Sequence, residues 1–254
     1  MNSYYLSFQD LVDFVKAVRS RTKSFQAYKE FEEFQGYLLL KYLASEGIST
    51  HDFRILDMAN GFGGQTNELS RESRYVVGLD LNYPPIKPST DQILADALHS
   101  PFGANSFDLI LSASLIEHIS KPMLLLEELY RILKPDGYIY LSFPPFYSIT
   151  GGHSYAPFHY LGEKTAVLLS KIRKRVFKKK IFGKVESLGE SYSSAYDNWG
   201  LYRITIKEAK RLIRSSGFMV IDQSTKWLPF NFSNIPLIGE VLTWHVQFLL
   251  KKRT

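Results

Sequence analysis

A glycine loop directly after a buried strand is the feature that most constrains how this chain folds. Within residues 54–64, an apolar run ends in Asp57, and a loop with three glycines follows it. An unbroken apolar run suits a buried parallel strand, and glycines let the backbone turn tightly against a ligand before a helix starts near Gln65. A second strand ends at Asp80, where a carboxylate can accept both hydroxyls of a ribose. This arrangement predicts an α/β fold with a nucleotide pocket.

The glycine loop alone leaves the kind of cofactor open. Ala59, Gly61 and Gly64 satisfy a relaxed G-x-G-x-x-G pattern with alanine in first place, which suggests a nicotinamide or flavin cofactor. The segments that follow narrow the choice, because strands and helices alternate along them. We expect these elements at 92–97 (a third strand), 106–114 (a fourth strand), 118–134 (a helix) and 135–143 (a turn and a fifth strand).

Several motifs occur in a fixed order along this part of the chain. They are the glycine loop, Gly78-Leu-Asp80, Asp96-Ala97, Ser106-Phe-Asp-Leu-Ile-Leu111, Glu117-His118 and Arg131-Ile-Leu-Lys-Pro-Asp-Gly137. In this order they resemble the motifs of the class I S-adenosylmethionine-dependent methyltransferases, and within these the small-molecule branch. The resemblance covers roughly residues 52–145 and resumes over 204–251. It implies S-adenosylmethionine as the cofactor and a doubly wound, Rossmann-like sheet of seven strands, mostly parallel, with an antiparallel C-terminal strand.

The resemblance also implies a role for each cofactor-binding position. The methionine part of the cofactor would be lined by Asp57, Ala59, Gly61 and Gly63, the ribose held by Asp80, the adenine contacted by Leu81, Asp96 and Ala97, and the sulfonium approached by Ser112. His118 would fix the loop after the fourth strand. Ala59 departs from the family pattern, which usually has glycine there, and Asp136 departs in the same way. If the backbone at Ala59 takes a positive φ, its methyl group weakens cofactor binding.

The composition is typical of one folded domain. The chain has 254 residues, of which 45% are hydrophobic and 15% aromatic, so it can bury a full core. It contains no cysteine, which excludes disulfides, thiolate metal sites and a cysteine nucleophile. The first residues lack the pattern of a secretory signal, and no apolar run approaches the ~18 residues of a membrane span. We therefore expect a soluble, cytoplasmic protein.

We expect this single domain, residues 1–254, to have four parts. They are a helical N-terminal cap (1–51), a cofactor-binding half (52–145), an acceptor-side insertion (146–203) and a closing part (204–254) with a helix from Thr205 to Gly217, a strand at 218–227, a short helix at 235–242 and a last strand at 245–251. The N-terminal helices either cover the cofactor pocket or only pack on the sheet, because aromatic residues at helical spacing suit both arrangements.

Two histidines in the insertion are the candidate catalytic residues. His153 and His159 lie in the glycine-rich and aromatic segment 151–162, directly after the fifth strand, where open α/β sheets bind ligands. Methyl transfer to a hydroxyl needs an aligned acceptor and the removal of its proton, and an imidazole is a suitable base near neutral pH. We expect His153 before His159 to be this base, because glycines precede it; the alternative is a histidine that only holds the loop. No metal is expected, since the segment has no clear carboxylate partner.

The rest of the insertion bears on the acceptor. Residues 171–184 concentrate positive charge and contribute much of the net charge of +6, so they either attract phosphate groups or an anionic membrane or form a solvated lysine face. Tyr192, Tyr196 and Trp199 follow beside Asp197 and Asn198, and rings next to short polar groups suit a sugar. Residues 151–162 are also similar to an insert of some actinobacterial methyltransferases associated with glycans or glycolipids. No nucleic-acid-binding module is recognisable.

These features together predict a methyltransferase that acts on oxygen. The expected acceptor is a sugar hydroxyl in a glycan, a glycolipid or a sugar metabolite, phosphorylated or lipid-linked in some cases, with peripheral membrane contact through the basic insert. Two alternatives stay open. One is a small-molecule or lipid-precursor methyltransferase acting on oxygen or nitrogen, and the other is a catalytically silent, cofactor-binding partner of a second methyltransferase.

Overall fold

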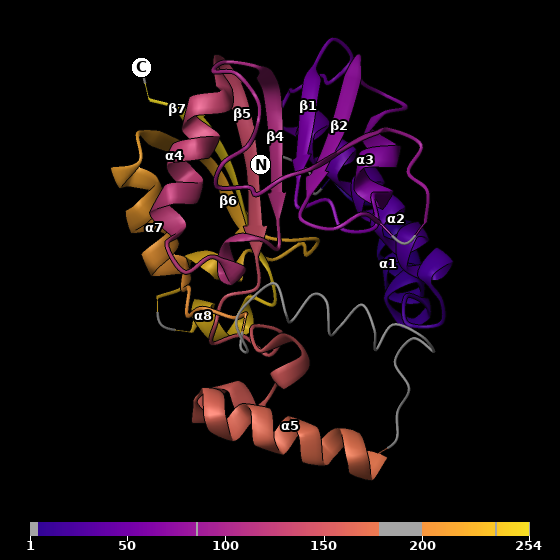
Figure 1. Cartoon of the computed structure of the whole chain (residues 1–254), viewed down its shortest axis with the longest axis vertical. Helices are drawn as coiled ribbons and strands as arrows, with labels where there is room; N and C mark the ends of the chain where they lie inside the picture. The colour runs from indigo at the N-terminus through magenta and orange to yellow at the C-terminus, as the bar shows by residue number, and fades with distance from the viewer. Residues whose placement is uncertain (1–4, 85, 178–199, 237, 254) are drawn as a thin grey trace.

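The fold is built on a seven-stranded sheet with helices on both faces. The computed structural model describes residues 5–84, 86–177, 200–236 and 238–253. The strands are β1 (Arg54–Met58), β2 (Tyr75–Asp80), β3 (Asp91–Leu94), β4 (Phe107–Ala113), β5 (Leu133–Phe143), β6 (Phe218–Thr225) and β7 (Val246–Lys252). The helices are α1 (Phe8–Ser20), α2 (Phe25–Ser45), α3 (Gly64–Leu69), α4 (Pro122–Ile132), α5 (Glu163–Phe177), α7 (Ile206–Ser215) and α8 (Gly239–Leu242) (Figure 1).

The strand order confirms the predicted fold class. The order is β3-β2-β1-β4-β5-β7-β6, with parallel pairing from β3 through β5. The last strand, β7, lies between β5 and β6 and runs antiparallel to both. The sheet is therefore doubly wound and Rossmann-like, and its C-terminal strand is antiparallel, as predicted from the sequence.

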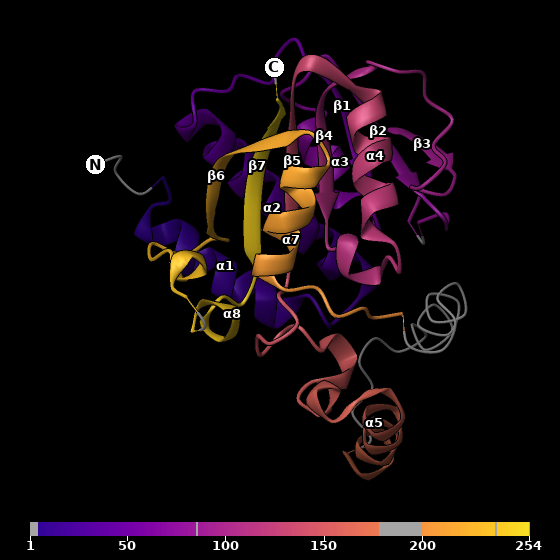
Figure 2. The same ribbon diagram turned by 90° about the vertical axis from the view of Figure 1, so that its left-hand side faces the viewer.

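Two apolar clusters fill the space between the sheet and its helices. In Figure 2, α4 and α7 lie in front of the sheet, and α1 and α2 lie behind it. On the α4 side, Leu125 and Leu129 pack in one cluster with Leu56 of β1. On the other side, Leu39 of α2 packs in the second cluster with Ile55, the neighbour of Leu56. Successive side chains of a strand point to opposite faces, which is why an unbroken apolar run serves both layers.

The helix α2 packs on the sheet and also contacts the glycine loop, and its predicted role as a cover of the cofactor pocket stays a prediction. The α2 residues Leu38, Leu39 and Leu43 are fully buried against the sheet. One turn or more earlier in the same helix, Glu32 reaches the glycine loop and accepts hydrogen bonds from its backbone. The helix α2 therefore packs on the sheet and also supports the loop of the predicted cofactor pocket.

Several predicted boundaries shift for local reasons. The helix expected over 118–134 is a short 3₁₀ helix, Ile116–His118, followed by α4, which begins at Pro122 because proline favours the first turn of a helix. The third strand ends at Leu94, before the Asp96 carboxylate accepts the Leu98 N–H in a turn. The helix expected from 235 begins only at Gly239, after Pro236.

The helix at Thr205 forms as predicted. The Thr205 side chain accepts the N–H of Glu208 at 3.1 Å, and α7 buries Ile206, Ala209 and Ile213 on one face. This satisfied N-terminus and apolar stripe are the features that identified the helix in the sequence.

The described part of the insertion projects from the sheet. Short 3₁₀ helices at His153–Tyr155 and Phe158–Leu161 lead into α5, which stands away from the sheet in Figures 1 and 2. On α5, Leu168 and Ile172 are exposed. Residues 178–184 of the basic run and the aromatic group at 192–199 lie outside the described residues, so the phosphate, membrane and sugar contacts expected of them stay predictions. Within the described ranges, no helix is both long and apolar enough to span a membrane.

Candidate active site

A cavity of about 220 Å³ lies at the carboxyl ends of the parallel strands. Ligands of open α/β sheets bind at this edge, where the strand order reverses. Its walls include five of the predicted cofactor residues, which are Ala59, Asp80, Leu81, Asp96 and Ala97. These residues lie at or just after the ends of β1, β2 and β3, and the fold brings them around one space.

The carboxylate of Asp80 lies buried at the end of β2. Its Oδ2 accepts the N–H of Gly61 at 3.1 Å, and its Oδ1 accepts the N–H of Asn82 at 2.9 Å. Burial raises the pKa of Asp80, and the backbone donors oppose that rise. Each carboxylate oxygen can accept more than one hydrogen bond, so this group can hold the glycine loop and still accept the hydroxyls of a ribose.

Asp57 anchors the other side of the glycine loop. It is 2% exposed at the end of β1, and its Oδ2 accepts the hydroxyl of Thr66 on α3 at 2.7 Å. Burial raises the pKa of Asp57 to about 6, against the hydrogen bond from Thr66. Gly63 caps α3 with a φ of +78°, a conformation that favours glycine. The loop therefore needs Gly63 for its shape.

Glu32 was not singled out in the sequence, yet it occupies the same loop. Its carboxylate accepts the N–H of Gly64 at 3.0 Å and that of Phe62 at 3.4 Å. Burial raises the pKa of Glu32 to about 8, with the nearby Asp57 and Asp80 adding to the rise and the two N–H donors opposing it. Nothing in the spacing of helix residues marks Glu32, because its role depends on how α2 crosses the loop.

Ala59 has a left-handed backbone. Its φ is +62°, and its N–H donates to the Leu79 carbonyl at 2.7 Å. The condition set in the sequence analysis is therefore met, since this position takes the conformation for which glycine is preferred. Ala59 also lies in the cavity wall, so its methyl group faces the same region as the ligand.

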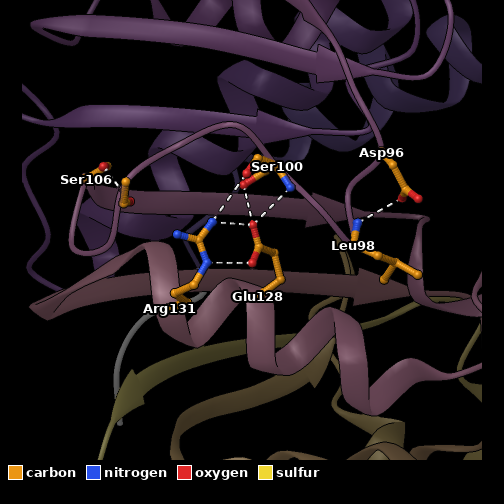
Figure 3. A network of polar contacts seen from close by, with 7 residues as sticks. Asp96, Leu98, Ser100, Ser106, Glu128 and Arg131 are labelled. Carbon is orange, nitrogen blue, oxygen red and sulfur yellow. Dashed lines mark hydrogen bonds and ion pairs between the residues drawn. The ribbon is translucent and has the colours of Figure 1, made fainter.

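A buried polar network holds the loop that carries Asp96. Figure 3 shows Arg131 and Glu128 of α4 paired with Ser100, next to the Asp96–Leu98 turn. Arg131 donates to both Glu128 oxygens at 2.7 and 2.8 Å, and Glu128 accepts the N–H and the hydroxyl of Ser100. Burial would raise the pKa of Glu128, but the hydrogen bonds from Arg131 and Ser100 outweigh it and lower the pKa. The network fixes this side of the cavity.

Ser112 lies deep in β4 opposite Met58 of β1 and is fully buried. Its hydroxyl has no hydrogen-bond partner among the residues that the structure describes. It does not contribute to the cavity wall, so its predicted place beside the sulfonium stays a prediction.

The cavity borders a cluster of titratable side chains. His118 lines the cavity, and its ring lies 4.9 Å from that of His153, centroid to centroid. The His153 Nε2 lies 3.4 Å from Oε1 of Glu117, which is 1% exposed. His153 takes a φ of +47°, and backbone strain of this kind gathers at functional sites. The fold therefore joins the insertion to the Glu117-His118 pair, of which His118 was expected only to fix the loop after the fourth strand.

His159 occupies a different environment. It is 1% exposed, and its Nε2 contacts the Phe146 carbonyl at 2.9 Å. Its ring lies where a side chain at Gly152 would have to be, so the glycine permits this close packing. Burial lowers the pKa of His159. The two predicted histidines therefore separate into one that joins the cluster and one that packs under the loop.

Lys226 lies buried near the carboxylates of Glu117 and Asp57. It follows β6, is 2% exposed, and its Nζ donates to Oε1 of Gln35 at 3.2 Å. Burial lowers the pKa of Lys226 to about 7, and the charges of Glu117 and Asp57 oppose the fall. No sequence pattern predicts the burial of Lys226, because a lysine after a strand is ordinarily exposed.

Two other hollows lie away from the predicted cofactor residues. One, of about 970 Å³, lies between α7 and residues 233–240. The other, of about 500 Å³, is lined by Tyr147, Tyr160, Glu240 and Val241. Tyr147 and Tyr160 flank the segment that carries His153, and two aromatic rings beside a carboxylate suit a sugar ring.

The 220 Å³ cavity fits the adenosine part of the cofactor that the sequence resemblance implies. It combines two carboxylates, Asp80 and Asp96, with apolar walls from residues such as Leu81, Leu115 and Ile119. Carboxylates can accept ribose hydroxyls and the adenine amino group, and apolar side chains can cover a flat ring.

Comparisons with known proteins give the family and the fold of the chain. Residues 56–141 match the family described as Methyltransferase domain. An uncharacterised methyltransferase of Mycolicibacterium gilvum is 28% identical over 127 residues, which cover 47% of this chain and 50% of that relative. An uncharacterised methyltransferase of Mycobacteroides abscessus is 23% identical over 223 residues, which cover 82% of this chain and 80% of that relative. The chain thus matches half the length of the first relative and four fifths of the second.

A solved structure shows the same fold. It is the 1,6-didemethyltoxoflavin-N1-methyltransferase of Burkholderia thailandensis with bound 1,6-didemethyltoxoflavin and S-adenosylhomocysteine. The TM-score is 0.53 at 14% identity, with 100% of this chain and 94% of that chain covered. At this identity the likeness concerns the fold and not the acceptor.

Proposed function

Because this chain is a class I S-adenosylmethionine-dependent methyltransferase in family and fold, we propose that it transfers the methyl group to a hydroxyl oxygen of a sugar. The sugar is free or part of a glycan or glycolipid. The observation that carries the proposal is the contact of Glu117 and His153 beside His118, at the border of the cofactor cavity. A hydroxyl must lose a proton in order to be methylated, whereas an amine needs mainly alignment.

The residues of the chain divide the work of the reaction. When bound, S-adenosylmethionine supplies a methyl carbon that its sulfonium activates for displacement. Asp80 and Asp96 hold the adenosine end, and the loop held by Asp57 and Glu32 receives the methionine end. His153 takes the proton from the acceptor hydroxyl. The oxygen–carbon bond forms as the sulfur–carbon bond breaks, and the proton on His153 passes to solvent.

Glu117 supports His153 in this step. Its buried carboxylate lies at ion-pair distance from His153 Nε2, so it stabilises the imidazolium that forms when His153 accepts a proton. His153 is partly exposed, with 33% of its side-chain surface open to solvent, and can meet an acceptor. The packed His159 supports the loop instead. The hollow between Tyr147 and Tyr160 favours a sugar as the acceptor.

The test is methyl transfer from labelled cofactor to a panel of sugars, nucleotide-sugars, glycolipids and amines. We expect one class of hydroxyl acceptor to be methylated, and His153→Ala to lower kcat by about 100-fold or more, the usual share of a general base. His51→Ala is the matched control, because His51 is exposed in a turn before β1. Undiminished turnover of a hydroxyl acceptor by His153→Ala would remove His153 as the base, and exclusive methylation of amines would remove the oxygen chemistry.

A further inference from the structure

We propose that Glu117, His118 and His153 form a binding site for a divalent transition-metal ion. Each residue offers one ligand atom, and these three atoms lie within 4.8 Å of one another. Two imidazoles and one carboxylate are a donor set that proteins use for zinc and for other first-row metals. The inference rests on the proposed function in one respect, because the ion would activate the hydroxyl oxygen that is methylated.

The state of Glu117 points to a missing cation. The residue is 1% exposed, and neither carboxylate oxygen has a hydrogen-bond partner among the residues that the structure describes. His153 lies at ion-pair distance but without the geometry of a hydrogen bond. Lys226 lies close enough for its charge to interact with that of Glu117, but it donates no hydrogen bond to these oxygens, and a buried carboxylate without hydrogen bonds is costly. An ion between Glu117 and the two imidazoles would satisfy these oxygens.

The geometry needs little adjustment to hold an ion. Two ligands on a tetrahedral zinc ion at about 2.1 Å are separated by roughly 3.4 Å, and His153 Nε2 and Glu117 Oε1 are 3.4 Å apart. The His118 Nδ1 contacts the Gly200 carbonyl, and a backbone carbonyl is a common partner that orients a metal-binding imidazole. The partly exposed His153 side chain provides the entry path.

The sequence expectation of no metal depended on the insertion alone. That segment carries His153 and His159 but no carboxylate close to them. The fold supplies the carboxylate from Glu117, and it replaces His159 by His118 as the second imidazole. The two parts of the proposed site are 35 residues or more apart in the chain, so a local pattern could not reveal it.

An ion held by three protein ligands keeps at least one position open for the acceptor. A hydroxyl that binds there loses its proton more easily, because the ion stabilises the oxyanion. The O–H bond would then break, the proton would pass to bulk water, and the oxygen–carbon bond would form as the sulfur–carbon bond of the cofactor breaks and S-adenosylhomocysteine leaves. Without the ion His153 takes the proton, and with the ion His153 is a ligand. The metal-free and metal-loaded clusters are two ways to activate the same oxygen.

The experiment is titration of the full chain, without a polyhistidine tag, with Co²⁺ and Zn²⁺ in the absence of cofactor and acceptor. We expect one equivalent to bind, Co²⁺ to give the intense visible absorption of a four- or five-coordinate site, and affinity to fall at least about 100-fold in Glu117→Gln and in His153→Ala. His51→Ala serves as the control. Circular dichroism verifies that each variant is folded.

Two results would overturn the proposed site. One is the absence of stoichiometric ion binding by the wild type. The other is that folded Glu117→Gln and His153→Ala bind the ion with the same affinity as the wild type. The outcome is separable from that of the methyl-transfer test. A wild-type protein that takes up no added Co²⁺ or Zn²⁺ but shows His153-dependent methylation would refute the metal site and keep the function. A protein that binds the ion but methylates no hydroxyl would refute the function and keep the site.

Discussion

At the scale of single residues, some positions in and near the candidate site have a strained, left-handed backbone. Ala59, Ser114, His153 and Trp227 all have positive φ values without being glycine. Ala59 lines the cavity, and His153 lies in the cluster beside it. Such strain persists where the surrounding structure over-determines it, commonly at binding sites. The strain at Ala59 is the easiest to relieve, because glycine adopts the same φ freely.

We predict that Ala59→Gly stabilises the protein. Removing the left-handed strain of alanine gains more than the extra freedom of glycine in the unfolded chain costs, so the net gain is about 1 kcal/mol or less. Urea unfolding of both proteins measures it. Ala27→Gly is the matched control, because Ala27 lies in the first turn of the helix α2 with a right-handed backbone, where the same change destabilises by up to about 1 kcal/mol. A loss of stability in Ala59→Gly would show that the methyl group packs favourably.

Residue identity also decided which parts of the site were predictable. Asp57, Asp80 and Asp96 end strands or begin turns at fixed distances from a glycine loop, so motif order located them. Glu32 and Lys226 belong to no motif, and they reach the site only through the crossing of α2 and the end of β6. Their burial, which gives them unusual pKa values, is a property of the packed molecule.

At the scale of elements, the sequence pattern predicted which helices and strands form better than it predicted the residues at which they begin and end. Apolar runs placed the central strands β1, β4 and β5, because both faces of the sheet are buried there, whereas β3 is short and has no fully buried residue. Boundaries failed where a side chain competes with the backbone, as Asp96 does after β3, or where proline delays a helix, as Pro236 does before α8. The cluster of Glu117 with His153 could not be predicted, because it depends on how a loop folds back over β4.

The contact between α2 and the glycine loop predicts a pH dependence of stability. The pKa of Glu32 is raised by burial to about 8 from 4.5, so the folded state resists its ionisation. This cost is absent below pH 4.5 and grows as the pH rises towards 8, up to a few kcal/mol. We therefore expect Glu32→Gln, which remains neutral, to gain stability relative to the wild type between about pH 5 and 8.

Urea unfolding of both proteins across that pH range measures the difference. Glu30→Gln is the matched control, because Glu30 lies exposed on the same helix. Asp57, whose pKa is raised to about 6, is common to all three proteins, and its charge contributes to the difference only through its repulsion of the Glu32 carboxylate. A difference between Glu32→Gln and wild type that does not change with pH would contradict the raised pKa of Glu32.

At the scale of the whole molecule, one edge of the sheet collects side chains from distant parts of the chain. Glu32 comes from the N-terminal helices, Asp57 and Asp80 from adjacent strands, His153 from the insertion and Lys226 from the closing part. The walls of the cavity come from the ends of β1, β2 and β3, from the segment after β4 and from Tyr202, so a ligand that fills it contacts several parts of the chain together. Binding is then linked to folding, because a ligand that binds only the native state stabilises it by an amount that grows with its concentration.

We predict that S-adenosylhomocysteine binds at one site and raises the melting temperature, whereas NADH does neither at the same concentration. Asp80→Asn keeps the size of the side chain but removes the charge that accepts both ribose hydroxyls, so we expect affinity to fall by about 10-fold or more. Asp91→Asn is the matched control, because Asp91 is exposed at the start of β3, whereas Asp80 pairs with Leu94 at the other end of that strand. Calorimetric titration gives the affinities, and thermal scans give the stabilisation. Equal binding to wild type and Asp80→Asn would move the ribose away from Asp80, and binding of NADH instead would mean that the alanine in the glycine loop marks a different cofactor.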